Sequence, residues 1–343
     1  MKKLFVFLLL LIPFNAHAFG SNARSAILMD MDSLRILYGK DINYTQSVAS
    51  ISKIMTAISV IEKVDIDKKI VVGDEVLKSY GSGIYVKRGE ELKIKDLLYG
   101  LMMRSGNDAA LVLAHNTSSS VEKFVDLMNK NANKIGMKNT TFKNPSGLDQ
   151  EDGGNISSAY DMALLMSYAM RNKDFRKIVS RKSYTLKTNM NVYKWTNKHK
   201  LLYSYKYMTG GKTGFTKIAK RTLVSTASKD GLNLVAVTIN DGNDFKDHVS
   251  LFEEAFSKYT NYLLVKKGKI IIPGEDYYKK SFYIKNNVSY PLNSDEKGIL
   301  KMKYELKKLR KYKNNSKVGV IKVYLGDDVI EKENIYLRIK NDK

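Results

Sequence analysis

The sequence predicts an α/β domain, in which helices flank an antiparallel sheet, followed by a small all-β sandwich domain. Two observations support this division. Up to about residue 262, apolar residues recur at helical spacing in several segments, and these alternate with short apolar runs typical of strands. Beyond that point the helical repeats stop, and strand-like runs alternate with lysine and glycine. The 343-residue chain is long enough for two domains, which we place at residues 19–262 and 263–343.

Residues 1–18 have the features of a secretory signal peptide. Lys2 and Lys3 supply the positive end, residues 4–12 the apolar stretch, and residues 16–18 (Ala-His-Ala) a small-residue cleavage site. The apolar stretch is too short to span a bilayer. We therefore expect export to the cell envelope, at the outer face of the cytoplasmic membrane, with the mature chain beginning near Phe19.

Composition narrows the chemistry and the partners. The chain has no cysteine, which excludes a thiol nucleophile, cysteine-ligated zinc and disulfides. Its formal charge is +23, or +21 without Lys2 and Lys3, and residues 261–343 hold 20 basic and 10 acidic residues, a net charge of +10. We do not expect nucleic acid as a partner, because no nucleic-acid motif accompanies the charge and export argues against it. Anionic cell-wall polymers or the membrane surface are the expected partners of this charge.

Several segments have clear secondary-structure signals. Two apolar runs at residues 25–31 and 34–38 predict a hairpin, and an apolar helical stripe predicts a buried helix that begins at Ser50. A helix over 96–103 should stop in a tight turn holding Ser105 and Asn107, after which Asp108 should cap the next helix. The later predicted elements are a helix over 121–135, a loop over 144–155, a helix from Ser158, strands over 223–227 and 232–239, and a helix over 245–259.

Ser50 and Lys53 are the first candidates for catalysis. Residues three apart share one face of a helix, so the hydroxyl and the amine should point the same way. A serine there has a nearby proton acceptor and a helix N-terminus to hold an oxyanion. The alternative is that Ser50 is a helix cap and Lys53 a solvated lysine. The same spacing also occurs at Ser120–Lys123 and Ser294–Lys297, so the pair alone is weak evidence.

Two further polar clusters make the pattern specific. Ser105-Gly106-Asn107 and Lys212-Thr213-Gly214 follow the first pair in order, and each tripeptide occurs once in the chain. Ser-x-x-Lys, Ser-Asp-Asn and Lys-Thr-Gly are together the signature of penicillin-binding proteins and class A β-lactamases. With Asn-Pro-Ser-Gly-Leu-Asp at 144–149 and a β-rich C-terminal part, the chain resembles the serine D-alanyl-D-alanine carboxypeptidases, the low-molecular-weight penicillin-binding proteins of peptidase family S11. The resemblance covers nearly all of the mature chain.

The resemblance implies a fold, an activity and a set of residue roles. Residues 19–262 would be the DD-peptidase domain, which removes the terminal D-alanine from peptidoglycan stem pentapeptides and is acylated by β-lactam antibiotics. No metal or organic cofactor is implied. The implied roles are nucleophile for Ser50, general base for Lys53, proton relay for Ser105, substrate amide binding for Asn107, carboxylate binding for Lys212 and Thr213, close approach of substrate for Gly214, and a backbone oxyanion donor for Phe215 beside that of Ser50.

Other interpretations stay open at this level. A DD-endopeptidase that cuts existing cross-links would carry the same motifs. A β-lactamase is disfavoured because no glutamate stands in the expected loop to activate a deacylating water. A non-catalytic wall-binding protein has no need of the Ser50–Lys53 pair. Asn155 stands where many relatives of the family have histidine, and we assign it no role. We also predict no C-terminal amphipathic anchor, because the chain ends on a strand-like run at 335–337.

Overall fold

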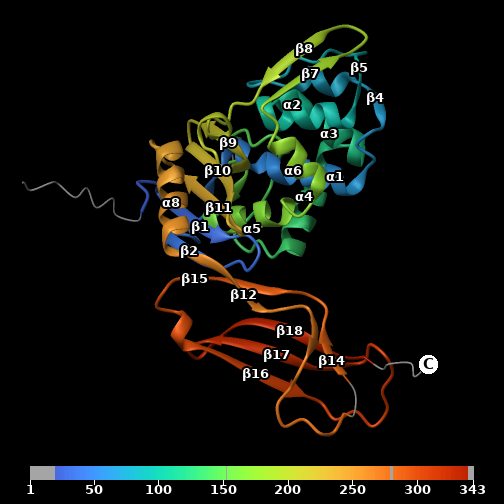
Figure 1. Ribbon diagram of the computed structural model, residues 1–343. Helices are drawn as coiled ribbons and strands as arrows, with labels where there is room; N and C mark the ends of the chain where they lie inside the picture. The colour runs from blue at the N-terminus through green and yellow to red at the C-terminus, as the bar shows by residue number, and fades with distance from the viewer. Residues whose placement is uncertain (1–19, 152, 279–280, 339–343) are drawn as a thin grey trace, which may run out of the picture.

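The computed structural model describes residues 20–151, 153–278 and 281–338, which form two parts (Figure 1). A body of helices around a sheet contains the first part of the chain, and a smaller β-structure lies below it in the view of Figure 1. The predicted signal peptide lies outside the described residues, as do residues 339–343. Strand β12 (Thr260–Val265) begins the β-rich part, and the division between 262 and 263 stays a prediction.

A five-stranded antiparallel sheet in the order β2-β1-β11-β10-β9 lies at the centre of the larger part. It joins the predicted N-terminal hairpin to the two strands predicted over 223–227 and 232–239, and adds β9 at one edge. Its strands are β1 (Ser25–Asp30), β2 (Ile36–Lys40), β9 (Met208–Thr216), β10 (Lys220–Lys229) and β11 (Leu232–Ile239). The Lys-Thr-Gly cluster therefore lies on an edge strand.

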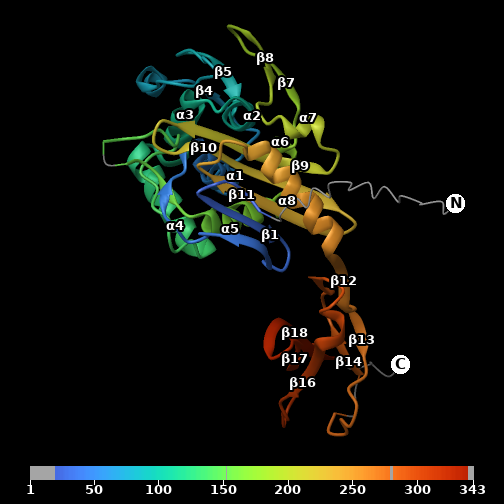
Figure 2. The ribbon, with the colours of Figure 1, turned by 90° about the vertical axis from the view of Figure 1, so that its left-hand side faces the viewer.

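Helices cover both faces of this sheet (Figure 2). On β1, Leu28 packs with α8, whereas its neighbours Ile27 and Met29 belong to the core on the opposite face, as the two-residue period of a strand requires. The helices are α1 (Lys53–Lys63), α2 (Ile94–Arg104), α3 (Asn107–Ser118), α4 (Val121–Ile135), α5 (Ala159–Ala169), α6 (Lys173–Val179), α7 (Leu201–Ser204) and α8 (Asp244–Lys258).

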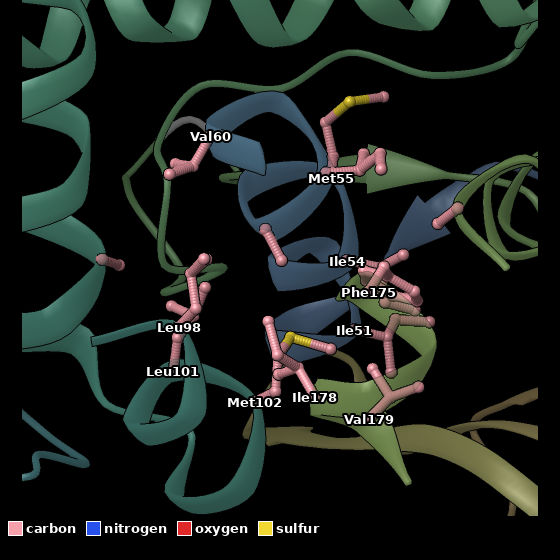
Figure 3. Close-up of a cluster of buried hydrophobic side chains, with 14 of the residues drawn as sticks. Ile51, Ile54, Met55, Val60, Leu98, Leu101, Met102, Phe175, Ile178 and Val179 are labelled. Atoms are coloured by element: carbon pink, nitrogen blue, oxygen red, sulfur yellow. The ribbon is translucent and has the colours of Figure 1, made fainter. Parts of the chain in front are cut away.

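Helix α1 is the buried centre of the helical side. Ile51, Ile54 and Met55 are fully buried, and Ile51 and Ile54 lie toward side chains of α2 and α6, including Met102 and Ile178 (Figure 3). A fully buried leucine or isoleucine stabilises the fold by roughly 1.5–3 kcal/mol. The first turn of this segment is therefore held rigidly, which matters because it carries Ser50 and Lys53.

Two predicted helix starts are wrong in detail. Ser50 lies in a 3-10 turn, η1 (Ala49–Ser52), and the α-helix proper begins at Lys53. Asp108 does not cap α3, because the helix already begins at Asn107. Instead the Asp108 carboxylate accepts the backbone N–H groups of Ile84 (3.0 Å) and Tyr85 (2.6 Å). A buried carboxylate needs such donors, and this pairing fixes the loop before α2.

The larger part also contains three two-stranded ladders among its described residues, and each part contains a further 3-10 turn. The ladders join β3 (Gln46–Ser47) to β6 (Ile156–Ser157), β4 (Lys69–Val71) to β5 (Glu91–Lys93), and β7 (Ser183–Lys187) to β8 (Val192–Thr196). The turns are η2 (Asp74–Lys78) and η3 (Lys297–Ile299). Within the described residues, no helix combines the length and apolar character that a membrane crossing requires.

The C-terminal part is all β, as predicted. Its five-stranded sheet has the order β13-β14-β18-β17-β16, and β12 pairs with β15 beside it. Val265 of β12 and Val288 of β15 share one core with Ile321 and Ile335 of the sheet, so the two layers pack together. The strands are β13 (Gly268–Ile270), β14 (Ser281–Ile284), β15 (Val288–Leu292), β16 (Leu300–Leu306), β17 (Lys317–Leu325) and β18 (Asp328–Arg338).

Candidate active site

Ser50 is presented by a strained turn. The residue before it, Ala49, has φ +51°, in the left-handed region that alanine rarely adopts. Gly147 packs directly against this residue, since a Cβ on Gly147 would lie 2.1 Å from the carbonyl oxygen of Ala49. Strain of this kind is concentrated at functional sites, where the surrounding structure holds it in place.

Lys53 is completely buried, and its amine reaches three oxygen atoms. Nζ lies 3.1 Å from Ser50 Oγ and 2.8 Å from Asn107 Oδ1, and it also donates to the carbonyl oxygen of Ser146. The pairing of Ser50 with Lys53 predicted from their spacing is therefore present. The solvated-lysine alternative is excluded by burial.

The environment favours the neutral form of Lys53. Burial lowers the pKa of Lys53 well below its ordinary value, and the nearby charges of Lys212 and Lys198 lower it further, against a smaller opposing effect of Asp108. A lysine can act as a base only when its amine is neutral, which either burial or a second nearby cation favours. Both contribute, and burial is the larger cause.

The Ser105–Asn107 turn brings the second cluster to the same place. Ser105 ends α2 in the left-handed conformation, with φ +65°. Asn107 opens α3, and while its Oδ1 accepts from Lys53, its Nδ2 donates to the carbonyl oxygen of Tyr80 at 2.7 Å. The amide of Asn107 is therefore oriented from both ends, and a left-handed residue makes the sharp change of direction between the two helices.

Lys212 lies on the edge strand β9, and its buried amine contacts the second cluster. Its Nζ donates to Ser105 Oγ at 3.1 Å and to the carbonyl oxygen of Thr213 at 2.6 Å. The side chain is 2% exposed. Burial, and secondarily the charge of Lys198, lowers the pKa of Lys212 to about 7. Its charge therefore changes near neutral pH.

Close packing requires glycine at position 214, which the sequence alone did not reveal. A Cβ at this position would lie 2.3 Å from Thr222 Oγ1, 3.0 Å from the backbone nitrogen of Ser50 and 3.1 Å from that of Ile51. The absence of a side chain lets β9 approach the turn that carries Ser50. Phe215 follows on β9 and is 65% exposed.

One cleft of about 350 Å³ connects these groups. Predicted residues from all three clusters line it, namely Ser50, Ser105, Thr213, Gly214 and Phe215. Lys53 and Lys212 lie buried beside it and bond to lining residues. Asn107 lines a neighbouring cavity of about 420 Å³ and reaches the site through Lys53. The three clusters, far apart in the sequence, therefore converge.

The structure adds residues that the sequence analysis missed. Lys198, Lys200 and Arg221 line the cleft beside the predicted residues, and Arg221 pairs with Asp244 at its rim. These cations make the cleft suitable for an anionic group. No motif marks them, because a lysine-rich chain offers many equivalent candidates. The Ser146 carbonyl was also missed, since any residue supplies a carbonyl and only the fold directs it at Lys53.

No histidine is among the described residues that line the cleft. His199 is buried under β9, with Nε2 3.0 Å from Ser225 Oγ, and His248 is buried with Nε2 3.1 Å from Thr238 Oγ1. Burial lowers the pKa of His199 to about 4, so its ring is neutral near pH 7. Among the described residues, histidine and the carboxylates form no group of three that could hold a metal ion.

Two family models match the chain. A model described as D-alanyl-D-alanine carboxypeptidase matches residues 13–243, and one described as penicillin-binding protein 5, C-terminal domain, matches residues 259–340. The curated relatives include the D-alanyl-D-alanine carboxypeptidase DacF of Bacillus subtilis, 33% identical over 322 residues, which cover 91% of this chain and 82% of the relative. DacB2 of Mycobacterium tuberculosis is 32% identical over 213 residues, 62% of this chain and 73% of the relative.

Solved structures extend the similarity to both parts of the chain. Penicillin-binding protein 5 of Haemophilus influenzae superposes with a TM-score of 0.79 at 26% identity, covering 93% of this chain and 97% of the other. Penicillin-binding protein 6B of Escherichia coli gives a TM-score of 0.73 at 26% identity, over 94% and 98% of the two chains. The arrangement of the larger part and the β-rich part together is therefore found in known structures.

Proposed function

The chain belongs to the D-alanyl-D-alanine carboxypeptidase family, and from this premise we propose that Ser50 is the nucleophile of a serine DD-carboxypeptidase of the penicillin-binding type. Its substrate class is the D-alanyl-D-alanine end of peptidoglycan stem peptides, with β-lactams as covalent inhibitors. The reaction passes through an acyl-enzyme on Ser50 Oγ.

The observation that carries this assignment is the geometry at Lys53. A neutral amine has two hydrogens and one lone pair. Asn107 Oδ1 and the Ser146 carbonyl accept the two hydrogens, which leaves the lone pair for the Ser50 hydroxyl at 3.1 Å. This distance is within the range required of a general base and its nucleophile.

Acylation follows from these positions. Ser50 Oγ attacks the carbonyl carbon of the penultimate D-alanine as its proton moves to Lys53 Nζ. The carbonyl oxygen becomes an oxyanion, for which the backbone N–H groups of Ser50 and Phe215 are the proposed donors. Donors fixed in advance are effective because they need not reorganise as charge develops, and removing one such donor typically costs ~10²–10³ in rate.

The leaving group and the second step use the remaining residues. The C–N bond breaks, and Ser105 Oγ relays to the departing D-alanine amine the proton that Lys53 took from Ser50. Lys212 and Thr213 bind the terminal carboxylate, and Asn107 binds the substrate amide. Water then attacks the ester, which returns the proton to Ser50 and releases the shortened peptide. Of the described cleft-lining residues, Asp244 is the one acid, and Arg221 pairs with it, in keeping with slow hydrolysis of a β-lactam adduct.

The setting of the reaction is part of the proposal. Peptidoglycan lies outside the cytoplasmic membrane, so the enzyme must be exported to reach its substrate. The basic and apolar N-terminal segment supports such export. The net charge of +10 over residues 261–343 supports contact of the C-terminal part with anionic cell-wall polymers or the membrane surface.

Intact-mass measurement after exposure to benzylpenicillin tests the assignment. We expect one stable adduct on Ser50 and release of D-alanine from a stem pentapeptide, with both lost in Ser50→Ala at unchanged thermal stability. Rapid turnover of the antibiotic would instead identify a β-lactamase. Cleavage of cross-linked dimers without pentapeptide trimming would identify an endopeptidase, and a folded protein without any adduct would indicate a wall-binding role.

A further inference from the structure

A buried amide, Asn155, holds a loop segment next to the site. It is 2% exposed. Its Oδ1 accepts the backbone N–H groups of Lys143 at 2.7 Å and Asn144 at 3.0 Å, and its Nδ2 donates to the carbonyl oxygen of Asn144 at 2.9 Å. These three hydrogen bonds go to two consecutive residues, so the side chain satisfies their backbone groups as a neighbouring strand would.

Asn144 extends this support along the loop. Its own Oδ1 accepts from the backbone N–H and the hydroxyl of Ser146, at 3.1 and 3.0 Å, and from the N–H of Gly147 at 2.7 Å. Its Nδ2 donates to the carbonyl oxygen of Leu148 at 3.0 Å. The side chain therefore closes the turn in which Ser146 lies. Thr56 ties the same turn to α1 by donating to the Pro145 carbonyl at 2.7 Å.

The support has one chemically important outcome. It points the Ser146 carbonyl at Lys53 Nζ, and that oxygen also lies 3.5 Å from Ser50 Oγ. The direction of an amine lone pair is set by the acceptors that hold its two hydrogens. One acceptor here is Asn107, which belongs to the motif, and the other is a backbone oxygen that the two buried amides hold in place.

We propose that Asn155 and Asn144 are positioning residues, which act through the Ser146 carbonyl to aim the Lys53 lone pair at the Ser50 hydroxyl. This inference rests on the proposed function, because it assigns Lys53 as the base. Truncating Asn155 removes all three of these hydrogen bonds, two of them from the buried backbone of Asn144, so the loop relaxes toward other partners. A shift of about 1 Å in a positioning group can cost about 10²-fold in rate.

The test separates binding of a β-lactam from acylation by it. For Asn155→Ala we expect the first-order acylation rate constant with benzylpenicillin to fall about 10- to 100-fold, with the dissociation constant of the initial complex unchanged within about two-fold. The matched control is Asn172→Ala, which also removes two accepted backbone hydrogen bonds (2.9 and 3.1 Å) but at the start of α6. It should lose comparable stability and acylate at the wild-type rate.

A second variant covers the case in which Asn155→Ala fails to fold. Asn144→Ala removes the oxygen that accepts from Ser146 and Gly147, and we expect acylation to fall at least about ten-fold. Wild-type acylation by folded Asn144→Ala, or by folded Asn155→Ala, would overturn the inference. A stable adduct on Ser50 of the wild-type protein, together with release of D-alanine from a stem pentapeptide, shows separately that the proposed function holds.

Discussion

At Lys212, one side chain combines a functional contact with a cost in stability. Its amine is buried between Ser105 and the backbone of β9, and burial lowers its pKa from 10.5 to about 7. The unfolded chain therefore binds more protons than the folded chain between about pH 7 and pH 10.5. Across this window the contribution of Lys212 to stability increases with pH, and it is least favourable at and below about pH 7.

We therefore expect Lys212→Met to be more stable than the wild type at pH 7, by on the order of 2–4 kcal/mol, because methionine fills the site without a charge to desolvate. The gap should close as the pH rises toward 10.5. Thermal unfolding at several pH values measures it, and the variant should also lose acylation. Lys301→Met, at an exposed position of β16, should show no such gap. A gap independent of pH for Lys212→Met would contradict the assigned cause.

At the scale of an element, the same sequence spacing has two different meanings. Ser120–Lys123 matches Ser50–Lys53 in type and spacing, yet Ser120 is the N-cap of α4 and its Oγ accepts the backbone N–H of Lys123 at 3.2 Å. Ser50 makes no such cap and lies in a 3-10 turn against a buried lysine. The spacing places the two side chains together, but burial decides whether the lysine is a base.

For Ser120→Ala we expect a loss of about 1 kcal/mol in unfolding free energy, the usual cost of removing a helix cap. Acylation by benzylpenicillin should stay at the wild-type rate. Chemical denaturation gives the first quantity, and intact-mass kinetics gives the second. A loss of acylation comparable to that of Ser50→Ala would show that the wrong pair had been assigned to catalysis.

The elements also show how far the sequence could lead. The hairpin, the strands of the central sheet, α4 with its Gly136 end and α5 with its Ser158 cap are all signalled locally by apolar spacing and caps, and the structure confirms them. The Ser105–Asn107 turn was also predictable, because helix ends and turn residues are local. Its roles in the reaction, like those of the other site residues, stay proposals.

What the sequence could not supply depends on long-range packing. The contact of the Ser146 carbonyl with Lys53 and the hydrogen bonds of Asn155 to the loop have no sequence motif. Both depend on where the fold places backbone atoms. Asp108 looked like a helix cap because acids are common at that position, yet it holds a loop 24 residues earlier in the chain. Local patterns cannot rank such distant partners against nearby ones.

At the scale of the whole molecule, Arg35 links the two parts. Its guanidinium pairs with both carboxylate oxygens of Glu296 and donates to the carbonyl oxygen of Pro291. It also lies over the rings of Tyr259 and Tyr290, 5.2 Å from each centroid. Both charged side chains are mostly buried, with exposed fractions of 14% and 17%. This cluster fixes the C-terminal part against the β1–β2 hairpin.

We expect Arg35→Ala to lower stability by about 2–4 kcal/mol, because it leaves the carboxylate of Glu296 partly buried and unpaired. The variant should also become sensitive to limited proteolysis near residues 259–262, while acylation of Ser50 stays within about two-fold of wild type. The control is Arg24→Ala, whose partner Asp41 is half exposed and which should lose at most about 1 kcal/mol. Equal losses for the two arginine variants would contradict a linking role.

The position of β9 at the edge of the sheet limits which bond of a bound peptide can reach Ser50. An extended peptide that pairs with this strand becomes an extra strand, and its successive residues face opposite sides. Only every second residue of such a peptide can turn its carbonyl toward Ser50. Carbonyl groups that can face Ser50 therefore recur about every 7 Å along β9. A shift of the peptide by one residue turns the carbonyl away from Ser50 and does not bring the neighbouring peptide bond into position.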